Sequence, residues 1–345
     1  MADAADRAVH EAEHTVSARG LGALLLLAFA VVLGVNALAI RRSPVEERTF
    51  DGYTVGAKWD LATEGAPDGG IVVTGDSSGN FAVVASVLEE ELGRSTRNYC
   101  TYGRFLATGA GWFLDRSIER SEGMPSLALI VLGSRTYALQ PGGFAFAQVP
   151  TAFGSWSSRA PHVALTLAEM GQVAVARLLP LFAQHRSFEF GIRRGRWMID
   201  TDILPITAGG DSILPRAYPE GVPKFAEKVI GEMQAFEGPV PSERERRAFE
   251  GLVRDAEDRG YDIVFVDGPV WSGLAARTTH AEFLGRAHVF LDELCATSEH
   301  AWHLPGPLQT FEPAEMENPY HLTRGAAVRF SRELSARLRS LGLPR

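Results

Sequence analysis

Near residue 75 a strand-like run leads directly into a tight turn and then a helical pattern. Ile71 to Thr74 are β-branched, as in buried strands, and Gly75-Asp76-Ser77-Ser78 follows with residues typical of turns and helix caps. Apolar side chains then recur at helical spacing from residue 81 to residue 92. A strand that leads into a helix is the basic unit of an α/β fold. Here it would place a serine hydroxyl at the edge of a sheet and the N-terminus of a helix, where negative charge is stabilised.

A second Gly-Asp-Ser occurs at residues 210–212 and serves as an internal comparison. It follows Thr207-Ala208-Gly209 and runs toward Pro215 and Pro219. Neither a strand-like run before it nor a helical pattern after it is present. Only the first copy therefore has the surroundings of a strand-to-helix turn.

Further strand-like and helical runs alternate along the chain. Short strands are predicted to end near residue 100 and over 127–132, 262–266 and 301–304. Helices are predicted over 104–120, 163–182, 242–259, 281–294 and 323–341, with a hairpin around 188–199. This alternation predicts an α/β fold in which a parallel sheet carries helices on both faces. Functional sites in such folds lie outside the carboxyl ends of the strands.

Leu21 to Ile40 forms an apolar stretch with Asn36 as its only polar side chain. Its length matches the roughly 30 Å hydrocarbon core of a bilayer, and it exceeds the apolar part of a cleavable signal peptide. We therefore expect an uncleaved single-pass anchor at the cell membrane, in contact with membrane lipid. The count of basic residues on the two flanks says little about orientation and leans slightly against export of the C-terminal part, so orientation stays open. Arg7 and Arg19 precede the span, and Arg41, Arg42, Arg48 and Lys58 follow it.

The resulting division has four parts. Residues 1–20 are a polar tail, 21–40 the anchor, 41–69 a linker rich in glycine and proline, and 70–345 one α/β domain with an insertion at about 136–260. The net charge of −8, without a basic block, argues against a nucleic-acid partner. Cys100 and Cys295 form no metal-binding pair, although one disulfide between them is conceivable.

Polar residues that follow the predicted strands should meet residues that precede the last helix. Ser77 follows the first strand, Asn98 and Gly103 the second, and Ser134-Arg135 the third. Asn318-Pro319-Tyr320-His321 precedes the final helix. A serine and a histidine at one rim have the composition of an acyl-transfer site, in which histidine accepts the hydroxyl proton and N–H groups hold the oxyanion. The structural alternatives are that Ser77 only caps a helix and that His321 only fills a core or capping position.

These motifs together resemble the SGNH/GDSL hydrolase superfamily. The similarity rests on GDSS after a strand, an Asn…Gly segment after the next, LxxLG after the third and a terminal xPxHLxxGxxxxFSxxL helix. It covers about 70–135 and 260–342, and the single anchor resembles the membrane-tethered branch that includes teichoic-acid D-alanylation and alginate O-acetylation proteins. The resemblance implies a three-layer flavodoxin-like sheet. It also implies Ser77 as nucleophile, His321 as base, and the Ser77 N–H, Gly103 and Asn98 at the oxyanion.

Two positions depart from that family pattern. Asn318 stands where the family has an aspartate that orients the histidine, and Arg135 stands where it usually has asparagine. A change from aspartate to asparagine costs roughly 10⁴ in turnover in a serine protease, yet Cys-His-Asn sites work. Asn318 is therefore predicted to orient His321, with Glu315 or Glu317 as substitutes. Arg135 either holds an oxyanion or sugar acid, or is a solvated rim residue.

Glu299-His300-x-x-His303 raises a metal hypothesis, which we disfavour because Pro305 prevents a helix there and a third ligand is not evident. We expect no metal and no cofactor. Trp197, Trp271 and Trp302 line a carbohydrate groove or, more simply, belong to the core.

Two functions from different classes follow. The first is a membrane-anchored esterase or O-acyltransferase that acts on acyl esters of a cell-envelope or secreted polysaccharide, with its domain outside the cytoplasm. The second is a non-catalytic partner or binding module of a multispanning membrane acyltransferase. A cytoplasm-facing lipid esterase is a further option, because the flanking charges do not fix the orientation.

Overall fold

The computed structural model describes residues 18–42, 50–103, 106–139, 166–179, 206–214 and 216–345. The strands are β1 (Ile71–Gly75), β2 (Thr96–Asn98), β3 (Leu127–Leu132), β4 (Asp262–Asp267), β5 (Val270–Trp271), β6 (Ala301–Leu304), β7 (Thr310–Phe311), β8 (Met316–Asn318) and β9 (His321–Leu322). The helices are α2 (Ala18–Arg42), α4 (Phe50–Thr63), α5 (Ser77–Ala82), α6 (Ala85–Leu92), α7 (Leu106–Arg120), η2 (Ser134–Ala138), α10 (Leu167–Leu178), α13 (Gly221–Ala235), α14 (Glu243–Arg259), α15 (Ser272–Ala275), α16 (Thr278–Cys295), η3 (Pro313–Glu315) and α17 (Arg324–Ser340).

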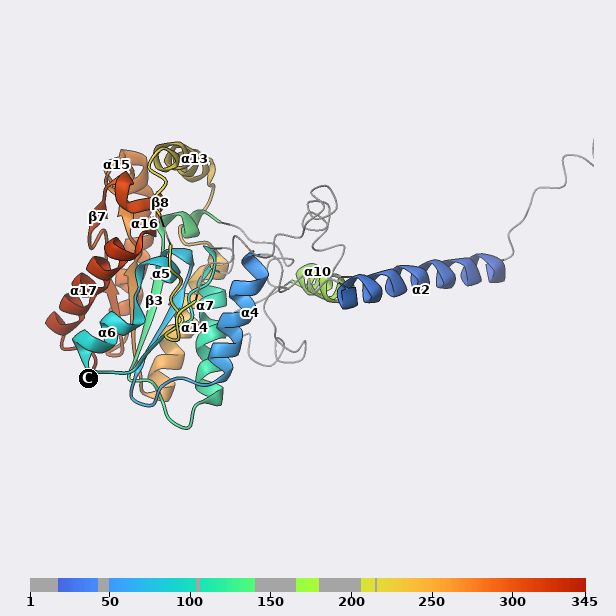
Figure 1. Ribbon diagram of the computed structural model, residues 1–345, viewed down its shortest axis with the longest axis horizontal. Helices are drawn as coiled ribbons and strands as arrows, with labels where there is room; N and C mark the ends of the chain where they lie inside the picture. The colour runs from blue at the N-terminus through green and yellow to red at the C-terminus, as the bar shows by residue number, and fades with distance from the viewer. Residues whose placement is uncertain (1–17, 43–49, 104–105, 140–165, 180–205, 215) are drawn as a thin grey trace, which may run out of the picture.

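Five parallel strands form the central sheet in the order β2-β1-β3-β4-β6. Helices α5, α6 and α17 cover one face, and α4, α7, α14 and α16 cover the other (Figure 1). Alternate residues of β1, β3 and β4 belong to the two cores; for example, Ile130 faces one and Val131 the other. Strands that are buried on both faces have nearly continuous apolar runs, so the sequence predicted β1, β3 and β4 directly. The predicted three-layer α/β fold is confirmed.

Gly75 ends β1 with a φ of 142°, and a Cβ there would lie 2.0 Å from the Val131 carbonyl oxygen. Only glycine fits this turn, because a side chain would collide with the neighbouring strand. The turn brings Asp76 to the N-cap of α5, where its side chain accepts a hydrogen bond from the Ser78 N–H. The Gly-Asp-Ser-Ser sequence thus positions Ser77 as the first helical residue.

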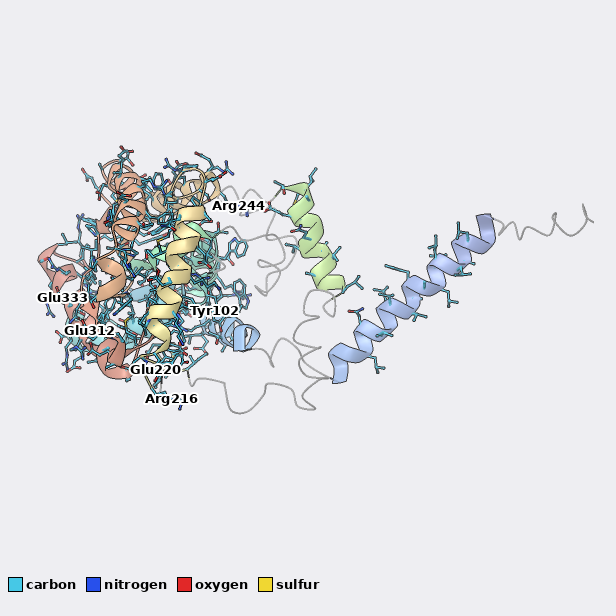
Figure 2. The ribbon with its side chains drawn as sticks, turned by 90° about the horizontal axis from the view of Figure 1, so that it is seen from above. Tyr102, Arg216, Glu220, Arg244, Glu312 and Glu333 are labelled. Atoms are coloured by element: carbon cyan, nitrogen blue, oxygen red, sulfur yellow. The ribbon has the colours of Figure 1, made fainter. Side chains whose placement is uncertain are left out.

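Helix α2 contains the apolar stretch Gly20–Leu38, 19 residues with a mean hydropathy of 2.5. Its leucine, valine and phenylalanine side chains are largely exposed in the protein, as Figure 2 shows. A helix of this length and composition can cross a membrane, and a signal sequence near an N-terminus has the same properties.

The structure differs from the predicted linker over 41–69, because residues 50–63 form helix α4 and pack on α7. Val55 and Ala62 are buried in the core. The buried Lys58 ammonium donates to the main-chain carbonyls of Asn98, at 2.9 Å, and Gly210, and burial lowers its pKa to about 8. This helix was not predicted, because a segment with three glycines from 52 to 65 and a charged lysine has the composition of an exposed linker.

The predicted insertion at 136–260 contributes three described helices. Helix α14 follows its predicted bounds and is capped by Ser242, whose side chain accepts from the Glu245 N–H. Helix α10 lies inside the predicted 163–182 segment, whereas α13 was not predicted. The predicted hairpin at 188–199, with Trp197, lies outside the described residues. Trp271 and Trp302 are partly buried against the core, and Cys100 and Cys295 are both free thiols.

We expect stability to fall as pH rises through a buried carboxyl on α14. Glu245 accepts from the Ala107 N–H at 2.7 Å and the Thr108 hydroxyl at 3.0 Å, and burial raises its pKa to about 7. Between pH 4.5 and 7 the folded state therefore holds a proton that the unfolded state has lost, so the free energy of unfolding decreases with pH. Glu245→Gln should remove this decrease, a difference of about 3 kcal/mol at pH 8.

Thermal unfolding at pH 5 and pH 8 measures this effect, with the exposed Glu250→Gln on the same helix as the matched control. An equal pH dependence in wild type and Glu245→Gln would contradict the assignment.

Candidate active site

Ser77 and His321 come together at the carboxyl end of the sheet. The Ser77 hydroxyl lies 2.9 Å from Nε2 of His321, although the two residues are 244 positions apart. Every other residue from 71 to 80 is buried, so Ser77 alone in this run reaches the surface. The His321 ring packs against Phe81 of α5, with 4.6 Å between ring centroids. Their predicted proximity is therefore observed, while their catalytic role remains a prediction.

His321 is held by the hairpin of β8 and β9, in which Asn318 pairs with His321 across Pro319-Tyr320. The Asn318 side-chain oxygen accepts from the main-chain N–H groups of Tyr320 at 3.0 Å and His321 at 3.2 Å. Asparagine commonly shapes tight turns in this way. The oxygen of Asn318 is thus committed to the turn.

Glu317 supplies the carboxylate that Asn318 lacks. Its Oε2 lies 3.0 Å from Nδ1 of His321, and the hydrogen bond with His321 lowers the Glu317 pKa below its ordinary value. The Asn318 amide nitrogen lies 2.8 Å from the same Nδ1. Since the Asn318 oxygen is turned to the backbone, its NH₂ can only donate, which requires an unprotonated Nδ1.

The two neighbours of Nδ1 therefore favour opposite tautomers of His321. Glu317 accepts from a protonated Nδ1 and leaves Nε2 free to take the Ser77 proton. Asn318 donates to an unprotonated Nδ1 and leaves the proton on Nε2, where it blocks that transfer. Glu317, one of the two substitutes considered from sequence, thus has the hydrogen bond that an orienting residue needs, and which of Glu317 and Asn318 orients His321 stays a prediction. Glu315, the other substitute, is paired with Arg329.

Asp76 ties the site to the end of the sheet. It is 2% exposed, and its two carboxylate oxygens accept from the Ser78 N–H, the Ser78 and Thr136 hydroxyls and the Gly133 N–H. These donors follow β1 and β3 directly in the chain. A buried carboxylate with four donors is well compensated for its loss of solvent. This scaffolding role was not predicted from the sequence.

A cavity of about 260 Å³ opens beside Ser77. Gly103, Arg135 and Asn318 from the predicted set line it, together with Asp76, Ser78, Tyr102, Gly133, Thr136, Leu139, Phe225, Tyr320 and His321. The Ser77 N–H begins α5 and has no acceptor within that helix, as is general for first-turn N–H groups. Ser77 and Gly103 both line the cavity, and their predicted role as the oxyanion pair stays a prediction.

Arg135 lines the cavity but is bound by Glu232 of α13. Its Nε and Nη2 donate to the two Glu232 oxygens at 2.7 and 3.0 Å, and its guanidinium lies 5.1 Å from the Phe225 ring centroid. These hydrogen bonds lower the Glu232 pKa. Arg135 is thus paired with Glu232 at the cavity wall, and its predicted role toward an oxyanion or a sugar acid stays a prediction.

Asn98 does not line the cavity among the described residues. It is fully buried; its amide group donates to the carbonyls of Val83 at 2.8 Å and Gly79 at 3.2 Å, and its oxygen accepts from the Cys100 N–H at 2.9 Å. Its donors are thus engaged with the backbone of the α5–α6 segment. This placement does not fit the predicted oxyanion role.

Asn98→Ala should therefore lower stability and spare the chemistry. Three buried main-chain groups would lose their partner, so we expect the free energy of unfolding to fall by about 3 kcal/mol. Turnover per folded molecule should stay within a few fold of wild type, measured beside Arg97→Ala as a control. A loss of 10²–10³-fold in turnover at unchanged stability, typical of a missing oxyanion donor, would restore the predicted role.

The second Gly-Asp-Ser copy supports the first. Asp211 accepts from the Ala85 N–H at 3.2 Å and pairs with Arg324 at the start of α17. The Ser212 hydroxyl donates to the Asn80 side-chain oxygen at 3.1 Å. Both residues are buried, so this copy is part of the packing behind α5 and presents no serine to the cavity.

Comparison with known proteins gives a fold-level likeness only. The chain matches no protein-family model and no curated protein. Among solved structures it is similar to one from Streptococcus pneumonia whose description names a platelet activating factor, with 11% identity, a TM-score of 0.39, and coverage of 88% of this chain and 99% of that one. It is also similar to an acetyl xylan esterase from the rumen bacterium Butyrivibrio proteoclasticus, with 11% identity, a TM-score of 0.34, and coverage of 80% of this chain and 65% of that one.

Proposed function

We propose that the protein is a serine-dependent esterase or O-acyltransferase that acts on short acyl esters. The observation that carries this proposal is the Ser77–His321–Glu317 relay, with 2.9 Å between Ser77 and His321 and 3.0 Å between His321 and Glu317. A hydroxyl, an imidazole and a carboxylate in this order are the components of nucleophilic acyl transfer on many unrelated folds.

The reaction proceeds in two balanced halves. The Ser77 oxygen attacks the ester carbonyl carbon while Nε2 of His321 takes the hydroxyl proton, and Glu317 stabilises the imidazolium. The oxyanion is held by the N–H groups of Ser77 and Gly103 until the bond to the leaving oxygen breaks, and that oxygen receives the proton from His321. Water or a sugar hydroxyl then attacks the acyl-Ser77 ester by the same steps and releases the acyl group.

The cavity supports a short acyl group on a neutral sugar. Its volume of about 260 Å³ lies just below the usual range of drug-sized sites, so it suits acetyl better than a lipid chain. Tyr102, Tyr320 and Phe225 supply aromatic lining of the kind that stacks on sugar rings. Because Glu232 neutralises Arg135, an acetylated neutral polysaccharide fits better than an anionic one.

We further propose that α2 anchors the protein in a membrane, with the α/β domain outside the cytoplasm, where envelope or secreted polysaccharide is found. A multispanning membrane acyltransferase would be the acyl donor in the transferase case. The flanking charges favour neither side strongly, so orientation needs its own test. A reporter fused after residue 345 and active only outside the cytoplasm would support this placement, and cytoplasmic reporter activity would contradict it.

Labelling with a fluorophosphonate tests the proposal against the non-catalytic alternative. Full-length protein in detergent should take up one label per chain, at Ser77, because the reagent reacts only with a serine whose proton a base removes. An acetyl ester should compete for the label more strongly than an octanoyl ester. Absence of labelling in folded protein would leave the binding module as the better interpretation.

A further inference from the structure

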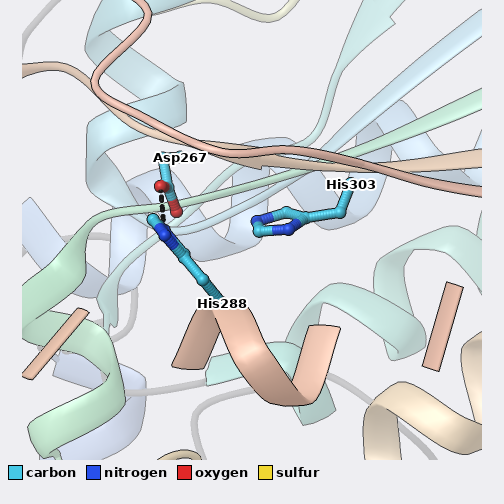
Figure 3. Close-up of side chains that lie close together, drawn as sticks. All are labelled: Asp267, His288 and His303. Carbon is cyan, nitrogen blue, oxygen red and sulfur yellow. Dashed lines mark hydrogen bonds and ion pairs between the residues drawn. The ribbon is translucent and has the colours of Figure 1, made fainter. Parts of the chain in front are cut away.

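A second cluster of ionisable groups lies away from the Ser77 cavity. Asp267 at the end of β4, His288 of α16 and His303 of β6 point toward one another, as Figure 3 shows. One ligand atom from each lies within 4.8 Å of the others. None of the three lines the Ser77 cavity. The relay described above makes no use of them.

Two atoms in this cluster are buried without a hydrogen-bond partner: Oδ1 of Asp267 and Nε2 of His303. The side chains of Asp267 and His303 are 5% and 2% exposed, so water does not compensate them freely. Buried polar atoms are nearly always paired, and an orphan pair that faces the same point calls for a ligand. The ion pair of His288 Nε2 with Asp267 Oδ2, at 2.5 Å, leaves both orphans unexplained.

The surrounding groups orient these atoms as metal ligands are oriented. Nδ1 of His303 lies 2.7 Å from an Asp292 oxygen, which fixes the proton on Nδ1 and turns the Nε2 lone pair inward. The Gly306 N–H donates to Asp267 Oδ2 at 2.6 Å and holds that carboxylate in place. A carboxylate behind one histidine and a main-chain donor behind the acid are common outer-shell partners of a metal site.

We propose that Asp267, His288 and His303 form a binding site for a zinc ion. Two imidazole nitrogens and one carboxylate suit Zn²⁺, whereas Mg²⁺ and Ca²⁺ prefer oxygen ligands alone. Zinc bonds of about 2.0–2.1 Å would draw the ligands inward by roughly 1 Å. Binding displaces the proton between His288 and Asp267, and the ion would link β4, β6 and α16.

This site differs from the metal hypothesis raised by Glu299-His300-x-x-His303. His300 and His303 are three residues apart at the start of a strand, so they point to opposite sides. His300 pairs with Asp262 at 3.1 Å, while His303 faces His288, with ring centroids 5.0 Å apart. The third ligand comes from α16, 15 positions earlier than His303, which no local spacing reveals.

The test measures zinc uptake by the full-length protein in detergent after treatment with a chelator. Equilibrium dialysis against Zn²⁺ should give one ion per chain for wild type and for the control His300→Asn. His303→Asn should abolish that uptake. Asp292→Asn, which removes only the outer carboxylate, should weaken binding about 10–100-fold. Cobalt substituted at the site should give visible d–d absorption that is absent in His303→Asn.

Thermal unfolding shows whether a variant that does not bind zinc has lost a ligand or has failed to fold. Zn²⁺ should raise the Tm of wild type and of His300→Asn, and leave that of His303→Asn unchanged. If His303→Asn fails to fold, the exposed Asp292→Asn supplies the comparison instead. Uptake of less than one ion by folded wild type, or equal zinc affinity in wild type, His303→Asn and Asp292→Asn, would overturn the proposal.

Discussion

Replacing Ser77 by alanine should reduce ester hydrolysis by about 10⁶-fold. Loss of the nucleophile has an effect of this order in a serine hydrolase, because the remaining groups cannot form the acyl-enzyme. His321→Ala should have nearly the same effect, since the two residues act as one unit and lie 2.9 Å apart. Hydrolysis of p-nitrophenyl acetate by purified protein measures both variants.

Ser212→Ala is the matched control, because this serine has the same tripeptide context but bonds to Asn80 in the core. It should retain wild-type turnover per folded molecule. Circular dichroism should be used to check that Ser77→Ala is folded. Turnover of folded Ser77→Ala within tenfold of wild type would remove Ser77 from the mechanism.

Exchange of Glu317 for glutamine should lower kcat by roughly 10²–10⁴-fold. The upper figure is that of a carboxylate-to-amide change in a serine protease, where the histidine is held in the wrong tautomer. Glu317 is 45% exposed, so solvent offsets part of the loss. KM should change little, because Glu317 contacts His321 and does not line the cavity.

Asn318→Ala is the opposing variant in the same hairpin. It removes the donor that favours the idle tautomer of His321, so turnover per folded molecule should stay equal or rise, while the loss of two turn hydrogen bonds lowers stability. Comparison of kcat for the two variants assigns the orienting residue. A larger loss in Asn318→Ala than in Glu317→Gln would return that role to Asn318.

The α/β fold and the proximity of Ser77 to His321 could be predicted from sequence, because both follow from short-range patterns. Apolar strands such as 127–132 and 262–266 end in polar residues, and parallel strands present those ends at one edge. Ser77 and His321 lie next to helix starts at that edge. Their proximity therefore needed only the order of elements and no knowledge of side-chain packing.

The choice between Glu317 and Asn318 depended on the register of a two-residue hairpin. The turn at Pro319-Tyr320 takes up the Asn318 oxygen, and this leaves Glu317 to reach Nδ1. Neither the sequence pattern nor the residue spacing shows which of two adjacent polar side chains will form hydrogen bonds with the main chain. The same limit explains Asn98, whose buried bonds to the α5–α6 segment arise only once the sheet is assembled.

Helix α13 was missed for a different reason. Val222, Ala226, Val229 and Met233 are buried at helical spacing, but Gly221 and Pro223 at its start read as a loop. This helix brings Phe225 to the cavity and Glu232 to Arg135, so one aromatic residue of the lining and the partner of Arg135 come from a region with no recognisable resemblance.

The repeated tripeptide at 210–212 has a practical consequence for reading mutational data. In a saturation screen that scores activity in cells, Asp211 would rank as intolerant as Asp76, since each buried carboxylate anchors several segments of the fold. Sensitivity at the repeat would then reflect how much folded protein survives, not what it does. Normalising each variant's activity to its abundance should separate the two copies. Variants of Ser77 should still show low activity, whereas variants at 210–212 should recover most of the wild-type activity per molecule.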